Sequence, residues 1–118
     1  MAVNVRQENG VIIFVPSGRL IGRGINELRD AINEHLTDDL EAPKLLFDFA
    51  DVSTVDSSGL GVLMSTHLSV TQKNGRIGVI NVGNSIKNLI IRSRLISTFE
   101  HFHTEAAAIA ALTDDSEN

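Results

Sequence analysis

The chain contains no cysteine, tryptophan or tyrosine. Without cysteine it cannot form a disulfide, a thiol nucleophile or a thiolate metal site, and this composition is typical of proteins from a reducing cytoplasm. Five Phe are the only aromatic residues. We therefore expect a core built mainly from Ile, Leu and Val.

Long apolar runs and clusters of basic residues are also missing. No stretch is long enough to cross a bilayer, and the start Met1–Asn4 lacks the charged and apolar parts of a signal peptide. The net charge is -5, and the Lys and Arg residues are scattered, so the broad positive surface that nucleic acids require is absent. We expect a cytoplasmic protein that neither inserts into membranes nor binds nucleic acid.

Strand-like and helix-like segments alternate along the chain. Val3 and Val5 alternate with polar residues, and a turn at Asn9-Gly10 leads into the apolar run 11–15, which predicts an antiparallel hairpin. Apolar residues at helical spacing predict an amphipathic helix over 25–36. The short apolar runs 45–49 and 77–80 are typical of buried strands.

The remaining elements complete the same pattern. A second helix follows Asp56 and ends at Asn74-Gly75, Ser85 can cap a third helix and Thr104 a fourth, and residues 95–102 close the sheet. We take 51–55 as a connector. The fold class is therefore α/β, with a mixed, mainly parallel sheet of four to five strands and about four helices. One domain spans 1–112, and 113–118 form a flexible acidic tail.

The segment Asp56-Ser57-Ser58-Gly59-Leu60-Gly61 joins a strand-like run to a helix that carries no charge before Lys73. Either Asp56 or Ser57 can accept a hydrogen bond from the first helical turn, so a plain N-cap is one interpretation. Glycine costs about 0.5 to 1 kcal/mol relative to alanine inside a helix. Gly59 and Gly61 therefore indicate that a strand or a visiting protein closely approaches this turn.

The uncharged helix has two contrasting faces. At 100° per residue we assign one face to the core: Leu60, Leu63, Met64, Leu68 and Val70. The opposite face carries small, uncharged side chains: Gly61, Val62, Ser65, Thr66, Ser69 and Gln72. Few of these side chains have to be desolvated or immobilised on contact, which favours a protein-docking surface.

Two segments resemble the signature of the STAS domain family, whose bacterial single-domain members are anti-sigma factor antagonists. They are Phe47-Asp48-Phe49-Ala50-Asp51-Val52 and Val55-Asp56-Ser57-Ser58-Gly59-Leu60-Gly61. The opening hairpin, the Asn74-Gly75 turn and the segment Leu95-Ile96-Ser97-Thr98-Phe99 follow in the family's order, so the resemblance covers nearly the whole chain. Its departure is Ile21, in the loop Gly18–Gly22, where members that are good kinase substrates often have an Asp.

The resemblance implies a phosphorylation-switched binding module with no catalytic residue, cofactor or metal of its own. Ser57, the first serine of the motif, corresponds to the phosphate acceptor, and the serine kinase that modifies it is the anti-sigma factor, which brings the ATP. A serine phosphatase would reset the switch, and a homodimer is possible. We expect the partner to contact Asp56, Ser58, Gly59, Gly61, Val62, Ser65, Thr66 and Ser69.

The same residues allow other interpretations of the protein's function. A serine hydrolase needs glycine two positions before its nucleophile, where this chain has Val55 or Asp56. Asp48, Asp51 and Asp56 are more often caps and turn formers than Mg²⁺ ligands. Domains of the same family also act as scaffolds in stress-signalling assemblies or as subunits of lipid-transport complexes, and fold alone does not separate these roles.

Three histidines are expected to have no catalytic role. His101 and His103 are spaced like metal ligands on a strand but lack a third ligand nearby, so we expect them on the surface beside Phe102. His67 is expected to be a partly buried histidine with its hydrogen bonds satisfied.

Overall fold

The computed structural model describes residues 2–83, 86–88 and 99–114. A mixed sheet has the strand order β1-β2-β3-β5-β6, and β4 pairs with β2. The strands are β1 (Ala2–Glu8), β2 (Val11–Leu20), β3 (Lys44–Asp48), β4 (Asp51–Val55), β5 (Arg76–Ile80) and β6 (Glu100–His101). The predicted α/β class is confirmed.

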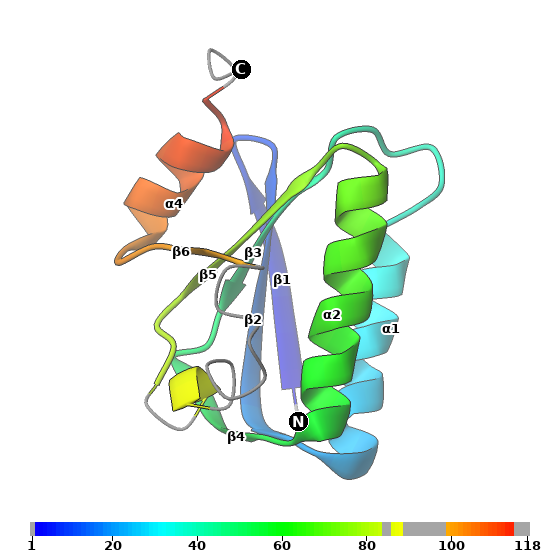
Figure 1. Ribbon diagram of the computed structural model, residues 1–118, viewed down its shortest axis with the longest axis vertical. Helices are drawn as coiled ribbons and strands as arrows, with labels where there is room; N and C mark the ends of the chain where they lie inside the picture. Colours follow the sequence, from blue (N-terminus) through cyan, green and yellow to red (C-terminus); the bar gives the residue numbers. More distant parts are fainter. Residues whose placement is uncertain (1, 84–85, 89–98, 115–118) are drawn as a thin grey trace.

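Helices cover both faces of this sheet. They are the 3-10 turn η1 (Gly22–Gly24), α1 (Ile25–His35), α2 (Ser57–Gln72) and α4 (Glu105–Leu112). Figure 1 shows α1 and α2 side by side on one face and α4 on the other. The fold therefore has three layers, with the sheet in the middle.

The predicted opening hairpin is present. β1 pairs antiparallel with β2, and the turn places Asn9 and Gly10 at φ 53° and 83°, the left-handed conformation that tight hairpin turns use. Every other strand pair is parallel among the residues that the structure describes. The sheet is thus mixed and mainly parallel, as predicted.

The expectation that 51–55 is a connector is wrong, because this segment forms β4. β3 pairs only with the first part of β2, from Val11 to Phe14, while β2 continues to Leu20. The later part of β2 is left with an open edge, and β4 fills it by pairing alongside Ser17 to Leu20. This explains why the sheet has six strands in the described part of the chain, rather than the predicted four to five.

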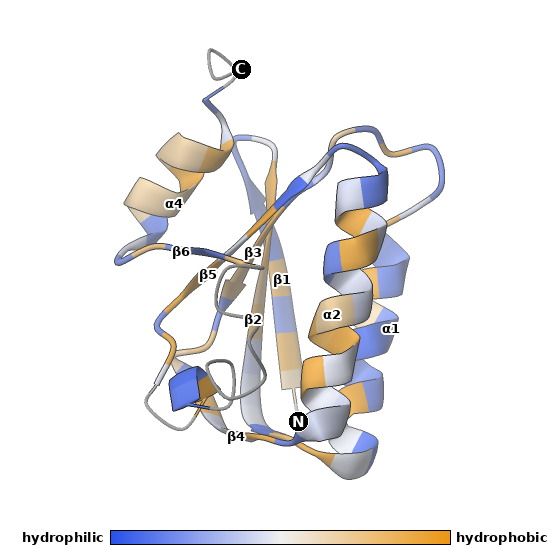
Figure 2. Cartoon of the chain, in the orientation of Figure 1, coloured by the Kyte–Doolittle hydropathy of each residue, from blue (hydrophilic) through white to orange (hydrophobic). Residues whose placement is uncertain are grey.

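Two apolar clusters hold the layers together. The larger lies between the sheet and α1 and α2, and the smaller lies beneath α4 around Ile13, Leu46 and Leu112. Most members are Ile, Leu and Val, as predicted, and Phe47 stacks against Phe14 and Phe49 with ring centroids 5.3 and 6.0 Å apart. Figure 2 shows α2 mostly white and orange, whereas α1 carries more blue residues.

Polar contacts attach α4 to the sheet. Arg6 of the edge strand β1 pairs with Glu105, with Nη1 3.0 Å from Oε2. Arg76 pairs with Glu100 and donates a 2.7 Å hydrogen bond to the carbonyl oxygen of Ala111. The predicted cap Thr104 is confirmed, since its hydroxyl oxygen accepts a 3.1 Å hydrogen bond from the backbone of residue 107.

α2 begins in direct contact with the end of β2. A Cβ added to Gly59 would lie 2.7 Å from the carbonyl oxygen of Leu20 and 2.9 Å from Cγ1 of Val55. At the other end of α2, the predicted stop at Asn74-Gly75 is confirmed by φ 63° at Asn74 and a 2.8 Å bond from Gly75 N to the carbonyl oxygen of Val70.

Several predictions fall on residues that the structure does not describe. Ser85 as a helix cap, the helix continuing through 89–90, the segment 95–98 and the last four residues of the acidic tail all lie outside the described residues.

Gly59→Ala should destabilise the fold, whereas Gly61→Ala should stabilise it. The first methyl group collides with a backbone carbonyl held between paired strands, and such overpacking costs about 1 to 3 kcal/mol. The second meets no atom within 4 Å, so only the helical preference for alanine remains, about 0.5 to 1 kcal/mol. Urea unfolding of both variants measures the difference, and equal midpoints would contradict it.

Glu105→Gln should lower stability at neutral pH and have no effect in acid. The hydrogen bond from Arg6 lowers the pKa of Glu105, so the pair stabilises the fold above the pKa of an unfolded glutamate, about 4.3. This contribution is lost as the pH falls through the lower folded value. Because the pair is partly exposed, we expect at most about 1 kcal/mol.

Urea unfolding between pH 7 and pH 3 measures this effect. Glu34→Gln is the matched control, because Glu34 is exposed and has no ion pair with the described residues. A difference between wild type and Glu105→Gln that stays constant over this range would refute the assignment.

Candidate partner-binding site

Asp56 is the N-cap of α2. Its backbone is extended, as expected for the residue before a helix. Its carboxylate oxygen Oδ1 accepts a 3.0 Å hydrogen bond from the backbone N–H of Gly59. Its own backbone N–H donates to the carbonyl oxygen of Leu20 at 3.3 Å. Asp56 therefore fixes both the start of the helix and its attachment to β2.

Ser57 is the first residue of α2, and it is exposed. Of the two capping candidates, the structure selects Asp56, and the Ser57 hydroxyl makes no hydrogen bond within the described part of the chain. Ser58 is exposed as well. Capping therefore accounts for Asp56 but leaves the Ser57 hydroxyl available to solvent.

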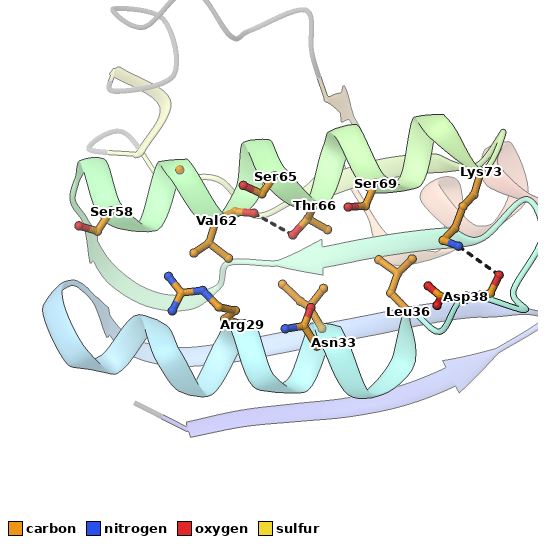
Figure 3. A pocket seen from close by; sticks show the side chains of 12 residues that line it. Arg29, Asn33, Leu36, Asp38, Ser58, Val62, Ser65, Thr66, Ser69 and Lys73 are labelled. Atoms are coloured by element: carbon orange, nitrogen blue, oxygen red, sulfur yellow. Dashed lines mark hydrogen bonds between the residues drawn. The ribbon is translucent and has the colours of Figure 1, made fainter.

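A groove runs between α1 and α2 and encloses about 640 Å³ (Figure 3). Its lining on α2 begins at Ser58 and follows one helical stripe. The full lining consists of Arg29, Ile32, Asn33, Leu36, Asp38, Ser58, Gly61, Val62, Ser65, Thr66, Ser69 and Lys73. Of the α2 residues that we predicted as a docking face, all but Gln72 form one side of this groove, whereas the expected contacts Asp56 and Gly59 do not line it.

The predicted faces of α2 need correction. Val62 and Thr66 were expected outside but are 7% and 5% exposed, and Gly59 is buried against Leu20. Leu68 was expected in the core but is 55% exposed. The reason is that α1 packs on the flank of α2, which turns the buried arc toward Val62 and away from Leu68.

The two glycines of the corner have different explanations. Gly59 is needed by the fold, because the backbone of Leu20 leaves no room for a side chain. Gly61 is exposed, and a Cβ there would meet nothing within 4 Å. Nothing in the described structure therefore requires glycine at position 61, although glycine weakens the helix there.

The other candidate residues have structural roles or exposed positions. Asp48 ends β3, and its Oδ1 accepts hydrogen bonds from Ala50 N at 3.0 Å and Asn81 Nδ2 at 2.9 Å. Asp51 is exposed at the start of β4. Within the described residues, no group of three or more His, Cys, Asp or Glu side chains is arranged to hold a metal ion.

The histidines differ in part from expectation. His101 and His103 are exposed, as predicted. His67 is partly buried with its ring edge-on to Phe99, the centroids 5.7 Å apart. However, Nδ1 of His67 is buried without a hydrogen-bond partner in the described structure, so the prediction of a satisfied histidine is wrong.

The contribution of α1 to the groove was not predicted from the sequence. Arg29 and Asn33 of α1 and Leu36, which caps its end, line the groove opposite α2. Their three- and four-residue spacing was a usable signal for a shared face, but nothing in the pattern identifies the neighbour of that face. Only the packing of the two helices reveals it.

Among the described residues, no helix is both long and apolar enough to cross a membrane.

Known proteins of one family match nearly the whole chain. The family model for the STAS domain matches residues 2–108. A protein of Paenibacillus polymyxa named anti-sigma F factor antagonist is 23% identical over 112 residues, which cover 95% of each chain. The crystal structure of an anti-sigma factor antagonist from Mycobacterium paratuberculosis is 27% identical, covers 96% of this chain and 94% of its own, and has a TM-score of 0.81.

The fold is also that of SpoIIAA, a Bacillus cell fate determinant solved in two forms. The unphosphorylated form has a TM-score of 0.79 at 19% identity and covers 93% of this chain and 95% of its own, and the phosphorylated form has a TM-score of 0.74. The match of the family model over almost the full length, on the fold described above, is decisive. The chain belongs to the STAS domain family.

Proposed function

We propose that this protein is a phosphorylation-switched binding module of the anti-sigma factor antagonist type. Unphosphorylated, it binds a serine-kinase anti-sigma factor in the cytoplasm, and phosphate on Ser57 releases it. The kinase supplies the ATP, and a serine phosphatase restores the binding form. The protein itself performs no catalysis and needs no cofactor.

The observation that carries this proposal is the free Ser57 hydroxyl at the start of α2. The hydroxyl is exposed and takes no part in capping, which Asp56 provides. It lies next to Ser58, where the lining of the groove on α2 begins. The similarity to proteins named anti-sigma factor antagonists supports the same assignment.

A phosphate at this position acts on the partner rather than on the fold. It adds a charge of about -1.5 to -2, and an exposed helix N-terminus favours an anion by about 0.3 to 1 kcal/mol. A docked partner that brings a negative charge within about 4 Å meets a repulsion on the order of 4 kcal/mol per unit pair at an effective dielectric of 20. Affinity then falls about a thousandfold.

The loop that follows β2 belongs to the same corner. Leu20, the last residue of β2, accepts the Asp56 N–H through its carbonyl, and the half-buried Ile21 is followed by the exposed Arg23 in η1. We propose that the kinase contacts this loop through apolar and basic side chains.

Substitutions at Ser57 should separate binding from release. Wild type and Ser57→Ala should bind the purified anti-sigma factor of the host with equal affinity, since the hydroxyl itself makes no contact that folding needs. Ser57→Asp should bind at least about tenfold more weakly, a difference of about 1.4 kcal/mol. Isothermal titration calorimetry gives the affinities, and phosphopeptide mapping after incubation with ATP identifies the modified residue.

Ser58→Ala is the matched control for phosphate incorporation, because Ser58 is the adjacent exposed serine. Incorporation of phosphate into Ser58→Ala, with none into Ser57→Ala, is expected. Equal affinity of wild type, Ser57→Ala and Ser57→Asp would rule out the switch. Constitutive assembly that ignores both Ser57 substitutions would instead support a scaffold subunit.

Gly61→Ala should weaken partner binding even though it strengthens the fold. The added methyl group projects into the groove, where the partner backbone is expected to lie, and an affinity loss of about tenfold is about 1.4 kcal/mol. Thr71→Ala, on the exposed part of α2 outside the groove lining, also raises helix propensity and should leave affinity unchanged. Unchanged affinity for Gly61→Ala would show that the partner does not enter the groove there.

A further inference from the structure

The groove between α1 and α2 has a neutral wall on α2 up to Ser69. Val62 and Thr66 form buried parts of this wall, and the Thr66 hydroxyl is already satisfied by a 2.8 Å hydrogen bond to the carbonyl oxygen of Val62. Gly61, Ser65 and Ser69 are exposed along the same side. Among the described residues, a visiting chain therefore meets no charge and no unsatisfied buried group on this wall between Ser58 and Ser69.

Positive charge exceeds negative charge in the lining. Of the twelve lining residues, Arg29 and Lys73 are cationic and Asp38 is anionic, which gives 2 - 1 = +1. The whole chain has a net charge of -5. The groove is thus a locally basic site on an acidic protein, and charge complementarity favours an acidic occupant.

Arg29 is the cation best placed to receive a carboxylate. Its Nη1 donates a 2.6 Å hydrogen bond to the neutral amide oxygen of Asn26, and it has no ion pair with the described residues. At the other end, Nζ of Lys73 lies 3.4 Å from the backbone oxygen of Asp38. The planar guanidinium of arginine also suits two-point binding of a carboxylate.

The dimensions suit a helix. The lining on α2 extends from Ser58 to Lys73, a distance of about 22 Å at 1.5 Å per residue. Side chains of an added helix can pack between the rows presented by α1 and α2. An added helix satisfies its own backbone hydrogen bonds. An extended strand would need backbone partners, which the hydroxyl-bearing and apolar walls of the groove do not supply.

We propose that the groove binds a helix of the partner protein whose Asp or Glu pairs with Arg29. This rests on the proposed function and names the contact through which the switch acts. Arg29 and Ser58 line the same groove, and Ser57 is the neighbour of Ser58. A phosphate on Ser57 therefore repels the partner's carboxylate and competes for the same guanidinium.

Photo-crosslinking in the host cell locates the partner segment. A photoreactive phenylalanine analogue replaces Asn33 on the groove side of α1, and the matched control carries it at the adjacent exposed Glu34, which is outside the lining. Mass spectrometry then sequences the crosslinked peptide. The analogue at position 33 should crosslink to a partner peptide that contains an Asp or Glu in a helical segment. The analogue at position 34 should give no crosslinked peptide.

Charge reversal with the purified, identified partner tests the ion pair. Arg29→Glu should lower affinity at least tenfold and Arg29→Gln less, and replacement of the partner's carboxylate by lysine should restore binding to Arg29→Glu. Lys87→Glu makes the same change of charge at an exposed residue outside the lining and should have no effect. Circular dichroism establishes that each variant is folded.

The outcomes separate this inference from the proposed function. An anti-sigma factor whose binding depends on Ser57 but is unchanged by Arg29→Glu would overturn the groove inference alone. If Arg29→Glu binds the partner variant that carries lysine, and phosphate on Ser57 does not change the affinity, the groove inference is supported and the phosphorylation switch is refuted. A crosslink from Asn33 only to a second copy of this chain, or only to a peptide without an acidic residue, would overturn the inference.

Discussion

The contact between the backbone of Leu20 and the first turn of α2 determines the geometry of this protein. The Leu20 carbonyl oxygen accepts the N–H of Asp56, and it lies against Gly59 so closely that no side chain fits between them. The pairing of β2 with β4, whose last residue directly precedes Asp56, holds the same position. These interactions fix where α2 starts, which residue caps it and where the two exposed serines lie.

Local patterns in the sequence were sufficient for most of the architecture. The hairpin turn, the amphipathic α1, the end of α2 and the cap Thr104 each depend on residues close together in the chain, where turn chemistry and helix periodicity are strong signals. β4 was missed because its existence depends on the unequal lengths of β2 and β3. That is a property of strand pairing between distant segments, and its own residues are half exposed.

The candidate site was predicted only in part, for a related reason. The family resemblance indicated Ser57, and residue chemistry indicated the small, uncharged side chains of α2, but the direction of burial around a helix depends on what packs against each flank. Because α1 lies beside α2, Val62 and Thr66 became groove lining and Leu68 became exposed. Likewise, only coordinates separate Gly59, which the fold needs, from Gly61, which it does not.

The separate roles of Asp56 and Ser57 affect how such a protein can evolve. Since the helix is started by the carboxylate of Asp56, the adjacent position is under no structural demand to remain a serine. A lineage can replace this serine through single codon changes while the start of the helix is kept. The cap and the exposed hydroxyl are thereby separable by mutation in neighbouring residues of one turn.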